Sequence, residues 1–479
     1  TPFPSTVQVA AQRFLCDVAA NYTDLEKEAG ELISLHRALG LQRSAFPDSL
    51  PALGRAVQEY PEALEFLTHD PQLALFPEMV ESAASYADKN QEQWNNLARA
   101  VRRFREQARK LGLGDPPTQV AVVCMDGDRM GKLLLHGSPE DPPVCWKHVL
   151  HPAVVKKIRS KKRFVDSGWG DLLHLPRLAG PALHAFISRA LADFSHTIVP
   201  WVVEQEFDGR LIYSGGDDLL AMAPADQALA MADRLRTLYA SPWIMDTWPD
   251  IAPWSWLEKD QPPQGPEQPG TRFQVIGGNE DLEQYLAELG HDRKPGRLMP
   301  MLGPGCTMSA GIMYGHFKTP LGRLLGASHE LLDTWAKERA GRNSAGLGHF
   351  SRGGVKTMFA APWDTGSLGL AHTVRLVRDA FAQPGGLPSA LPYKLREQRR
   401  LLDPFDLERS AGIGEGEMAR LMKGLLARAV GDAGVSDASL RAVLDLWKAG
   451  HVLKECPDSD DLAGLFFCRY LAARTKGEE

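Results

Sequence analysis

Hydrophobic and polar positions change their spacing along the chain, and these changes predict three regions. Residues 1–114 are mostly helical in pattern, and their charged, weakly periodic stretch over 91–114 ends in Gly and "DPP", a stop signal. Residues 115–365 mix strand and helix patterns, and residues 366–479 again have a helical pattern. We therefore expect a mixed central domain between helical N-terminal and C-terminal regions.

The central region contains the elements of one sheet. A run rich in β-branched residues over 118–126 predicts a buried strand, and residues 180–206 show helical spacing and lead into a hairpin over 211–224. Residues 247–271 are dense in proline and polar side chains and predict a loop insertion. The order of elements suits an α+β fold, a sandwich with a mostly antiparallel sheet. Further elements are expected as helices over 231–241 and 321–341 and as a strand over 306–315.

Composition places the chain among globular proteins. Its 479 residues are 44% hydrophobic and 24% charged, which is enough for two to four domains. No run approaches the roughly 18 apolar residues of a membrane span, and no signal peptide is visible, so we expect a cytoplasmic protein without a membrane partner. The first residue is not Met, which predicts a processed chain or a fragment. The six cysteines show no metal-ligand spacing, so we expect no zinc and no disulfide framework.

Charge is unevenly distributed. The net charge of −6 argues against a protein that coats nucleic acid indiscriminately. One local run is strongly basic and could attract an RNA phosphate backbone. An ordinary solvated helix face remains the alternative. The candidate RNA-binding residues are Lys156, Lys157, Arg159, Lys161, Lys162 and Arg163.

The hairpin "LIYSGGDDLLAMAP" carries two glycines and two aspartates at its tip. A plain tight turn would account for both residue types. However, the strand over 118–126 ends with Asp126, and if it neighbours the hairpin, Asp126 faces Asp217 and Asp218. Carboxylates at such close quarters repel one another unless protons or cations intervene. Hard oxygen ligands favour two Mg²⁺ or Mn²⁺ ions, an arrangement suited to displacement at phosphorus.

Other residues could hold phosphates near these carboxylates. Gly127 and Gly131 allow close approach of the backbone, ahead of an expected helix N-terminus. Lys337 and Arg342 are cations five residues apart across a helix end. Taken alone, such a lysine is usually part of the wet face of an amphipathic helix.

Together, "MDGDRMG", "YSGGDD", "TMSAGI" and "AKERAGRN" resemble the nucleotidyl-cyclase palm, a ferredoxin-like domain. This palm is shared by GGDEF diguanylate cyclases and by the large subunit of type III CRISPR effector complexes. Leu134 and Leu135 stand where a GGDEF cyclase has its guanine-reading Asn-Asp pair, and Asp218 replaces Glu. The spacing from Lys337 to Arg342 is also one residue longer. "SAGIMYGHFKTPL" and "TPFPST" resemble the type III-B (Cmr) version of the large subunit.

The resemblance implies a target-RNA-activated enzyme that converts ATP into cyclic or linear oligoadenylates. Its implied partners are guide CRISPR RNA, target RNA and the other protein subunits of the complex. The residues carried over by motif are Asp126, Asp217 and Asp218 as catalytic metal ligands, Gly215 and Gly216 beside the nucleotide, Lys337 and Arg342 at the triphosphate, and Ser309 near the nucleotide.

The sequence also departs from the family pattern. His69-Asp70 stands alone, without the further ligands of the HD nuclease domain that many members carry, and no cysteine cluster is present. Two alternative functions stay open. One is a stand-alone nucleotide or diguanylate cyclase, and the other is a non-catalytic scaffold subunit that binds ATP.

Overall fold

The structure is a computed structural model of the chain. It describes residues 3–475 except for 42–44, 88, 132–144, 151, 178–179, 248–271, 277–296, 351–355, 400–423, 425–427, 429–434 and 453–459. In the described part, no helix is both long and apolar enough to cross a membrane.

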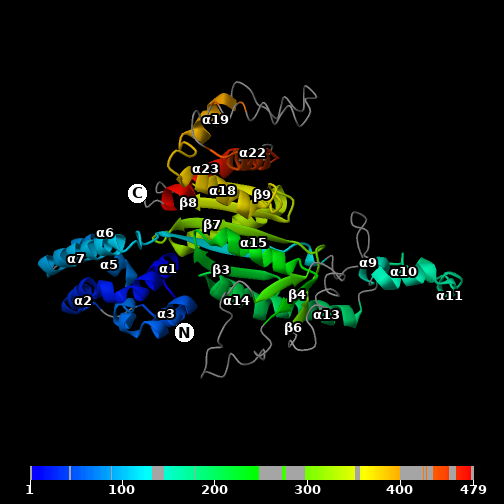
Figure 1. Cartoon of the computed structure of the whole chain (residues 1–479), viewed down its shortest axis with the longest axis horizontal. Helices are drawn as coiled ribbons and strands as arrows, with labels where there is room; N and C mark the ends of the chain where they lie inside the picture. The colour runs from blue at the N-terminus through cyan, green and yellow to red at the C-terminus, as the bar shows by residue number, and fades with distance from the viewer. Residues whose placement is uncertain are drawn as a thin grey trace.

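A six-stranded sheet forms the centre of the molecule, with the spatial order β2-β3-β1-β7-β8-β9 (Figure 1). Within it, β7 and β8 run parallel and the other neighbouring strands are antiparallel. The strands predicted over 118–126 and 306–315 and the hairpin over 211–224 are confirmed. The strands are β1 (Gln119–Gly127), β2 (Arg210–Ser214), β3 (Asp218–Pro224), β7 (Met308–His316), β8 (Ser344–Phe350) and β9 (Lys356–Pro362).

Four of these strands and two helical segments form the predicted ferredoxin-like unit. The chain order is β1, helix, β2, β3, helix, β7, and the spatial order is β2-β3-β1-β7, as in that fold. The second helix is α15 (Ala228–Tyr239). The first is a continuous helical segment made of α13 (Pro181–Asp193), η3 (Phe194–Ile198), α14 (Val199–Trp201) and η4 (Val202–Glu206).

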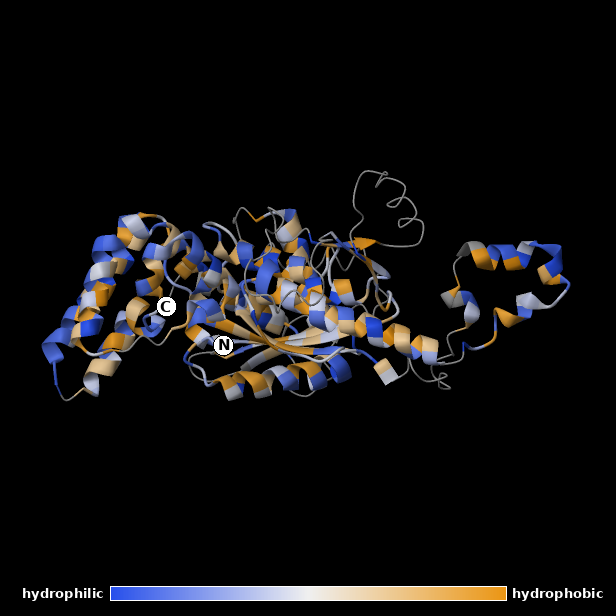
Figure 2. Cartoon of the chain, turned by 90° about the horizontal axis from the view of Figure 1, so that it is seen from below, coloured by the Kyte–Doolittle hydropathy of each residue, from blue (hydrophilic) through white to orange (hydrophobic). Residues whose placement is uncertain are grey.

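Both faces of the sheet are buried, which explains the unbroken apolar run of β1. Ala121, Val123 and Met125 join the core on one face, whereas Val122 and Cys124 join the core on the other. Side chains alternate between faces along a strand, so a strand covered on both sides needs apolar residues at every position. Figure 2 shows the largely hydrophobic strands lying between helices.

One face is covered by helices from the N-terminal part of the chain. The predicted helix over 91–114 is confirmed as the last of them, α7. These elements are α1 (Thr6–Ala20), α2 (Tyr22–Ala38), η1 (Pro47–Ser49), α3 (Pro51–Glu59), η2 (Pro61–Ala63), α4 (Leu64–Leu67), α5 (Pro71–Leu75), α6 (Pro77–Ser85) and α7 (Gln91–Lys110).

The opposite face is covered by α15 and by C-terminal helices, which share one core with the sheet. Phe467, for example, packs against Tyr314 of β7 and Phe359 of β9. The expected domain boundaries at 114 and 365 stay predictions. The C-terminal helices are α18 (Leu370–Ala382), α19 (Leu391–Arg399), α22 (Asp437–Val452) and α23 (Ala463–Thr475).

A helix after β7 lies directly on the sheet. It comprises α17 (Leu321–Glu330) and the π-helical segment η7 (Leu331–Arg339), and it confirms the helix predicted over 321–341. A Cβ atom at Gly311 of β7 would overlap the carbonyl oxygen of Ser328, so only glycine permits this close approach. The approach brings the end of η7 over the end of β1.

The hydrophobic pattern did not predict a second, three-stranded sheet. Its strands have four residues each, too few to show a clear period. Of the insertion predicted over 247–271, residues 248–271 lie outside the described part. The strands are β4 (Trp243–Asp246), β5 (Phe273–Ile276) and β6 (Arg297–Pro300), in the order β5-β4-β6.

Among the described residues between β1 and α13, four short helices form an arm that stands away from the body in both ribbon views (Figures 1 and 2). They are α9 (Trp146–Val149), α10 (Pro152–Ser160), α11 (Lys162–Val165) and α12 (Trp169–Leu172).

Candidate functional site

The tip of the β2–β3 hairpin lies beside the end of β1. In the antiparallel register, Asp126 is the direct partner of Asp218. The Gly127 amide also donates a hydrogen bond of 3.0 Å to the carbonyl oxygen of Asp217. The three aspartates that the sequence predicted to face one another therefore occupy adjoining backbone positions at the end of β1 and the tip of the hairpin.

The turn between the strands needs its glycines. Gly216 has φ of +100°, a conformation that side chains rarely adopt, and the Gly215 amide closes the turn on the Asp218 carbonyl oxygen at 2.9 Å. A Cβ atom at Gly215 would also lie 2.7 Å from Asp218 Oδ1. The turn thus holds the two aspartates at the edge of the site. The glycines form a tight turn, and that same turn presents the aspartates, so the two interpretations of this segment are compatible.

Charge is concentrated at this sheet edge. Burial raises the pKa of Asp217, and the neighbouring charges of Asp126 and Asp218 raise it further, while Lys337 acts in the opposite direction. Mutual repulsion of the carboxylates is thus a physical feature of the site. It favours the binding of a cation or a proton.

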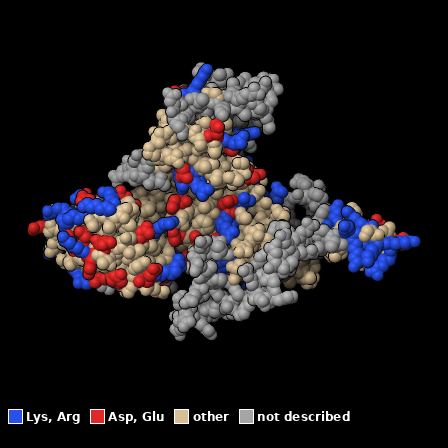
Figure 3. All heavy atoms as spheres, viewed as in Figure 1, with Lys and Arg blue, Asp and Glu red and all other residues tan. Residues whose placement is uncertain are grey.

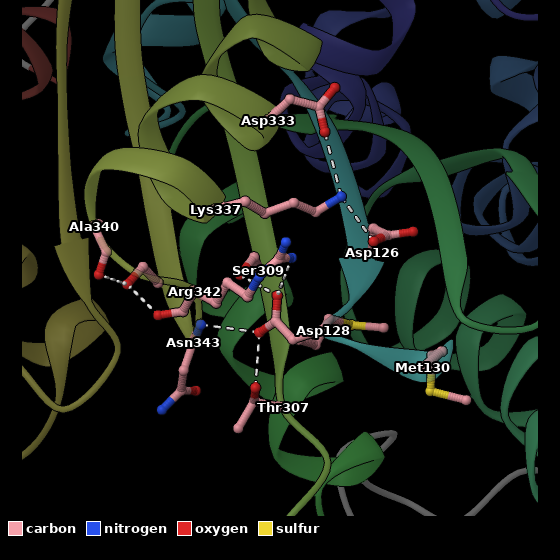
Figure 4. A network of polar contacts seen from close by, with 12 residues as sticks. Asp126, Asp128, Met130, Thr307, Ser309, Asp333, Lys337, Ala340, Arg342 and Asn343 are labelled. Atoms are coloured by element: carbon pink, nitrogen blue, oxygen red, sulfur yellow. Dashed lines mark hydrogen bonds and ion pairs between the residues drawn. The ribbon is translucent and has the colours of Figure 1, made fainter. Parts of the chain in front are cut away.

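Lys337 supplies one such cation from η7. Its Nζ lies 2.8 Å from Asp126 Oδ2 and 3.3 Å from Asp333 Oδ1 (Figure 4). Burial alone would lower the pKa of Lys337, but the hydrogen bonds to and the charges of these two carboxylates outweigh burial and raise it. The ammonium group is therefore charged and lies directly over the end of β1.

Asp128 is the buried centre of a second network (Figure 4). Its carboxylate accepts hydrogen bonds from Thr307 Oγ1 at 2.7 Å, Ser309 Oγ at 2.8 Å and the backbone amide of Asn343 at 2.9 Å. Arg342 Nη1 lies 3.8 Å from Asp128 Oδ1. Asp128 therefore joins the end of β1, the start of β7 and the loop that follows η7.

That loop is conformationally unusual. Gly341, Arg342 and Asn343 have φ of +81°, +74° and +47°, so three successive residues are left-handed. Non-glycine residues adopt this region only where their surroundings hold them. The hydrogen bond from the Asn343 amide to Asp128 supplies that restraint and places the Arg342 guanidinium beside the site.

Ser309 lies on β7 opposite Asp126, as expected for a strand next to β1. Its side chain is fully buried and its hydroxyl donates to Asp128. Ser309 therefore contacts the site through its hydrogen bond to Asp128.

Gly127 is closely packed, whereas Gly131 is not. A Cβ atom at Gly127 would overlap the Tyr239 hydroxyl and lie 3.0 Å from Asp217 Cβ, but one at Gly131 would meet no atom within 4 Å. The helix expected after Gly131, with Leu134 and Leu135, lies almost wholly outside the described residues.

Two site residues were not predicted, Asp128 as a network centre and Tyr239. Tyr239 is buried on α15, and its hydroxyl donates to the sulfur of Met130 at 3.0 Å. Burial, followed by the charge of Asp217, raises its pKa. Sequence spacing could indicate neither role, because the partners of these residues are more than 100 positions away.

The oxygen donors near Asp126 can be compared with those that a divalent metal ion requires. No group of three or more His, Cys, Asp and Glu side chains within the described ranges is arranged to hold a metal ion. Mg²⁺ is often bound by one or two carboxylates together with substrate phosphates, and Asp126 and Asp218 offer two hard oxygen donors side by side. The donors therefore fit such ions, although Lys337 now contacts Asp126. Two-ion binding and the expected absence of zinc both stay predictions.

The structure does not bring the basic run to this site. Its six residues lie on α10 and α11 or between them, on the arm, with exposed side chains. His69 and Asp70 are also elsewhere: the His69 ring packs 4.8 Å from the ring of buried His36, and the Asp70 carboxylate caps α5 through the Gln72 amide.

Comparison with known proteins identifies similar chains. Residues 119–247 match the family model of the second palm domain of Cas10/Cmr2. The CRISPR system Cmr subunit Cmr2 of Pyrococcus furiosus is 26% identical over 289 residues, which are 60% of this chain and 24% of that protein. The chain thus spans about a quarter of the length of that curated relative.

A solved structure shares the fold. The cryo-EM structure of the type III-B Cmr-beta complex bound to cognate target RNA contains a chain that matches with a TM-score of 0.54 at 15% identity. The match covers all of this chain and 48% of the other. Together these matches confirm the resemblance to the large subunit of type III-B effector complexes and the fold class, a palm domain with helical flanks.

Proposed function

We propose that the edge carrying Asp126, Asp217 and Asp218 is a nucleotidyltransferase site. In the proposed reaction a ribose 3′-hydroxyl attacks the α-phosphate of ATP, a new phosphodiester bond forms and pyrophosphate leaves. The products are cyclic or linear oligoadenylates. The observation that carries the proposal is the pairing of Asp126 with Asp218, with Asp217 and Lys337 at the same edge.

Each residue has a role that follows from its position. Asp126, Asp217 and Asp218 would hold two Mg²⁺ or Mn²⁺ ions. When bound, such ions lower the pKa of the attacking hydroxyl and neutralise charge on the leaving pyrophosphate. Gly216 and Gly131 have open space beside the backbone for a nucleotide, whereas Gly215 and Gly127 are packed against side chains of the chain and would act by shaping the turn and the end of β1. Ser309 would act by holding Asp128, which positions the loop of Arg342.

Lys337 and Arg342 are the proposed contacts for the triphosphate. Lys337 neutralises Asp126, and a cation that balances a carboxylate can turn to phosphate oxygens when a metal-bound nucleotide takes its place. The Arg342 side chain is partly exposed beside Asp128, so it too is accessible to an anion.

We place this chain in a type III-B effector complex, with guide CRISPR RNA, target RNA and other protein subunits as partners. The support is the palm-domain match and a relative whose complex is described as bound to cognate target RNA. In this proposal, pairing with target RNA activates ATP turnover.

The direct test is Asp217→Ala with Asp218→Ala in the assembled complex. Loss of both carboxylates should leave assembly intact and reduce pyrophosphate release from ATP at least a hundredfold, because transition-state charge loses its electrostatic stabilisation. Asp226→Ala is the matched control, since this exposed carboxylate follows the other end of β3. Unchanged turnover in the double variant would place the active site elsewhere.

A second candidate function is a scaffold subunit that binds ATP without turnover. The contact of Lys337 with Asp126 and the lack of a three-residue ligand group among the described residues favour it. It predicts that the unaltered complex binds ATP but releases no pyrophosphate under any RNA condition.

A further inference from the structure

The two ends of the arm pair with each other where it leaves the body. Residues 145 and 176 form an isolated β-bridge, and the Lys147 amide donates to the Leu173 carbonyl oxygen at 3.0 Å. The substantial contacts of α10, α11 and α12 are with one another. The arm therefore presents most of its surface to the surroundings (Figure 1).

The surface of the arm is strongly basic on an acidic chain. Residues 145–176 contain seven Lys and Arg but two Asp, whereas the whole chain has a net charge of −6. Figure 3 shows the blue side chains gathered at the tip of the arm. Because charge repulsion destabilises such a cluster, its most direct use is to bind a polyanion.

The basic run of the arm is not neutralised by carboxylates of the described residues. None of the six Lys and Arg between 156 and 163 forms an ion pair with a described carboxylate. By contrast, arginines of α7 are paired: Arg102 with Glu81, Arg103 with Glu31 and Arg105 with Asp115. The cations of the arm are thus free to contact a ligand.

Aromatic rings are exposed beside these cations. Trp169 is 47% exposed and Trp146 is 39% exposed, although tryptophan is usually buried. The Trp169 ring lies 5.6 Å from the Phe164 ring, and the Arg163 guanidinium lies 4.5 Å from the centre of the same Phe164 ring. Arg163, Phe164 and Trp169 therefore form a continuous cation–aromatic surface.

We propose that the arm binds single-stranded nucleic acid, with phosphates on its Lys and Arg side chains and bases stacked on Trp169 and Trp146. Stacking requires unpaired bases, so exposed rings among cations favour a single strand over a duplex. The lysines of the arm count against a protein partner, because lysine is depleted in protein interfaces, but its Trp and Arg side chains suit one, so protein docking is an outcome that the test must separate. That the strand is RNA rests on the proposed function.

The stacking part of the proposal is tested with the full chain and a fluorescent 20-nucleotide RNA, read by anisotropy. Trp146→Ala with Trp169→Ala should weaken binding about tenfold or more and leave the salt dependence unchanged, because stacking releases no counterions. Val165→Ala with Leu172→Ala is the matched control: these arm residues are 54% and 46% exposed but carry no ring. Equal affinity of the Trp variant and this control would overturn the stacking contact.

The phosphate part is tested by a salt series. Changing Lys156, Lys157, Lys161 and Lys162 to Glu should weaken binding and lower the slope of log K against log salt by up to about 3, at roughly 0.7 per lost phosphate contact. An unchanged slope would show that the basic run does not contact phosphates and is an ordinary solvated surface. A single-stranded DNA of the same sequence separates RNA from nucleic acid in general, and a matched RNA duplex should bind without sensitivity to the Trp change.

This inference can fail independently of the proposed enzyme. The arm variants are assayed for RNA binding and for assembly, whereas the Asp217/Asp218 variant is assayed for pyrophosphate. If the Trp variant loses other subunits but keeps its RNA affinity, the arm docks on protein and the inference is wrong. If RNA affinity falls while ATP is never turned over, the inference stands and the proposed function fails.

Discussion

At the scale of single residues, Asp128 determines how the site is built. It lies two positions beyond Asp126, but the two carboxylates have different surroundings: Asp126 is half-exposed beside Lys337, and Asp128 is buried among three hydrogen-bond donors. A buried carboxylate is tolerated when such donors satisfy its oxygens. Asp126 is therefore suited to bind cations, and Asp128 to hold the loop around Arg342.

The role of Asp128 gives a testable prediction. Asp128→Asn replaces one acceptor oxygen with an amide that cannot accept from its donors, so it should destabilise the site by about 2 kcal/mol. Hydrogen exchange should accelerate at residues 341–345, where the left-handed loop loses its restraint. Asp333→Asn is the control, because that carboxylate is exposed and contacts Lys337. Equal protection of 341–345 in both variants would contradict this role.

Sequence alone predicted Asp126, Asp217 and Asp218 as neighbours. The prediction needed only one strand, one hairpin and the assumption that they pair, and the structure has that pairing. It could not assign Asp128 or Tyr239, because their partners Asn343 and Met130 come from distant segments brought together by packing. Local pattern contains no information on such contacts.

At the scale of elements, the position of α17 and η7 on the sheet decides where Lys337 lies. The helix packs so closely that Gly311 of β7 and Gly346 of β8 both lack room for a Cβ atom. A larger separation would carry the Lys337 ammonium away from Asp126. Gly311 and Gly346 therefore help to position Lys337, although neither residue lies in the site itself.

Gly311→Ala tests this link between packing and site. The added methyl would overlap Ser328 backbone, so we expect a destabilisation of about 1–3 kcal/mol and weaker binding of ATP, measured by calorimetry. Gly322→Ala is the control on α17: its added methyl meets no atom within 4 Å and should stabilise by about 0.4–1 kcal/mol. Similar effects of the two substitutions would show that close packing does not position Lys337.

The two nine-residue strands of the large sheet were predictable, and the four-residue strands of the small sheet were not. β1 and β7 have nine residues each and were predicted within two residues of their ends. β4, β5 and β6 have four residues each, and β5 and β6 join β4 only through long connections. Their pairing depends on tertiary contacts such as the Arg272 guanidinium, which bonds Asp246 at 2.9 Å.

At the scale of the whole molecule, helices from both ends of the chain pack on the same central sheet. N-terminal helices pack on one face and C-terminal helices on the other. The Phe467 ring of α23 lies 5.0 Å from the Tyr314 ring of β7 and 5.5 Å from the Phe359 ring of β9. Stability of the sheet therefore depends on segments that the sequence pattern assigned to a separate region.

Phe467→Ala should consequently destabilise the sheet as well as its own helix. Truncating a fully buried phenylalanine costs about 3–5 kcal/mol, and hydrogen exchange should accelerate in β7 and β9 together with α23. Phe466→Ala is the control, since its ring is only partly buried and faces Tyr393. Faster exchange confined to α23 would instead indicate an independent C-terminal domain.

We propose that the aspartates at this sheet edge form a nucleotidyltransferase site that RNA activates. The most direct measurement incubates the purified effector complex with ATP, GTP, CTP or UTP in turn, with and without complementary RNA, and identifies products by mass spectrometry. We expect oligoadenylates and pyrophosphate from ATP when complementary RNA is present. Products from GTP without RNA, or no product from any nucleotide, would contradict it.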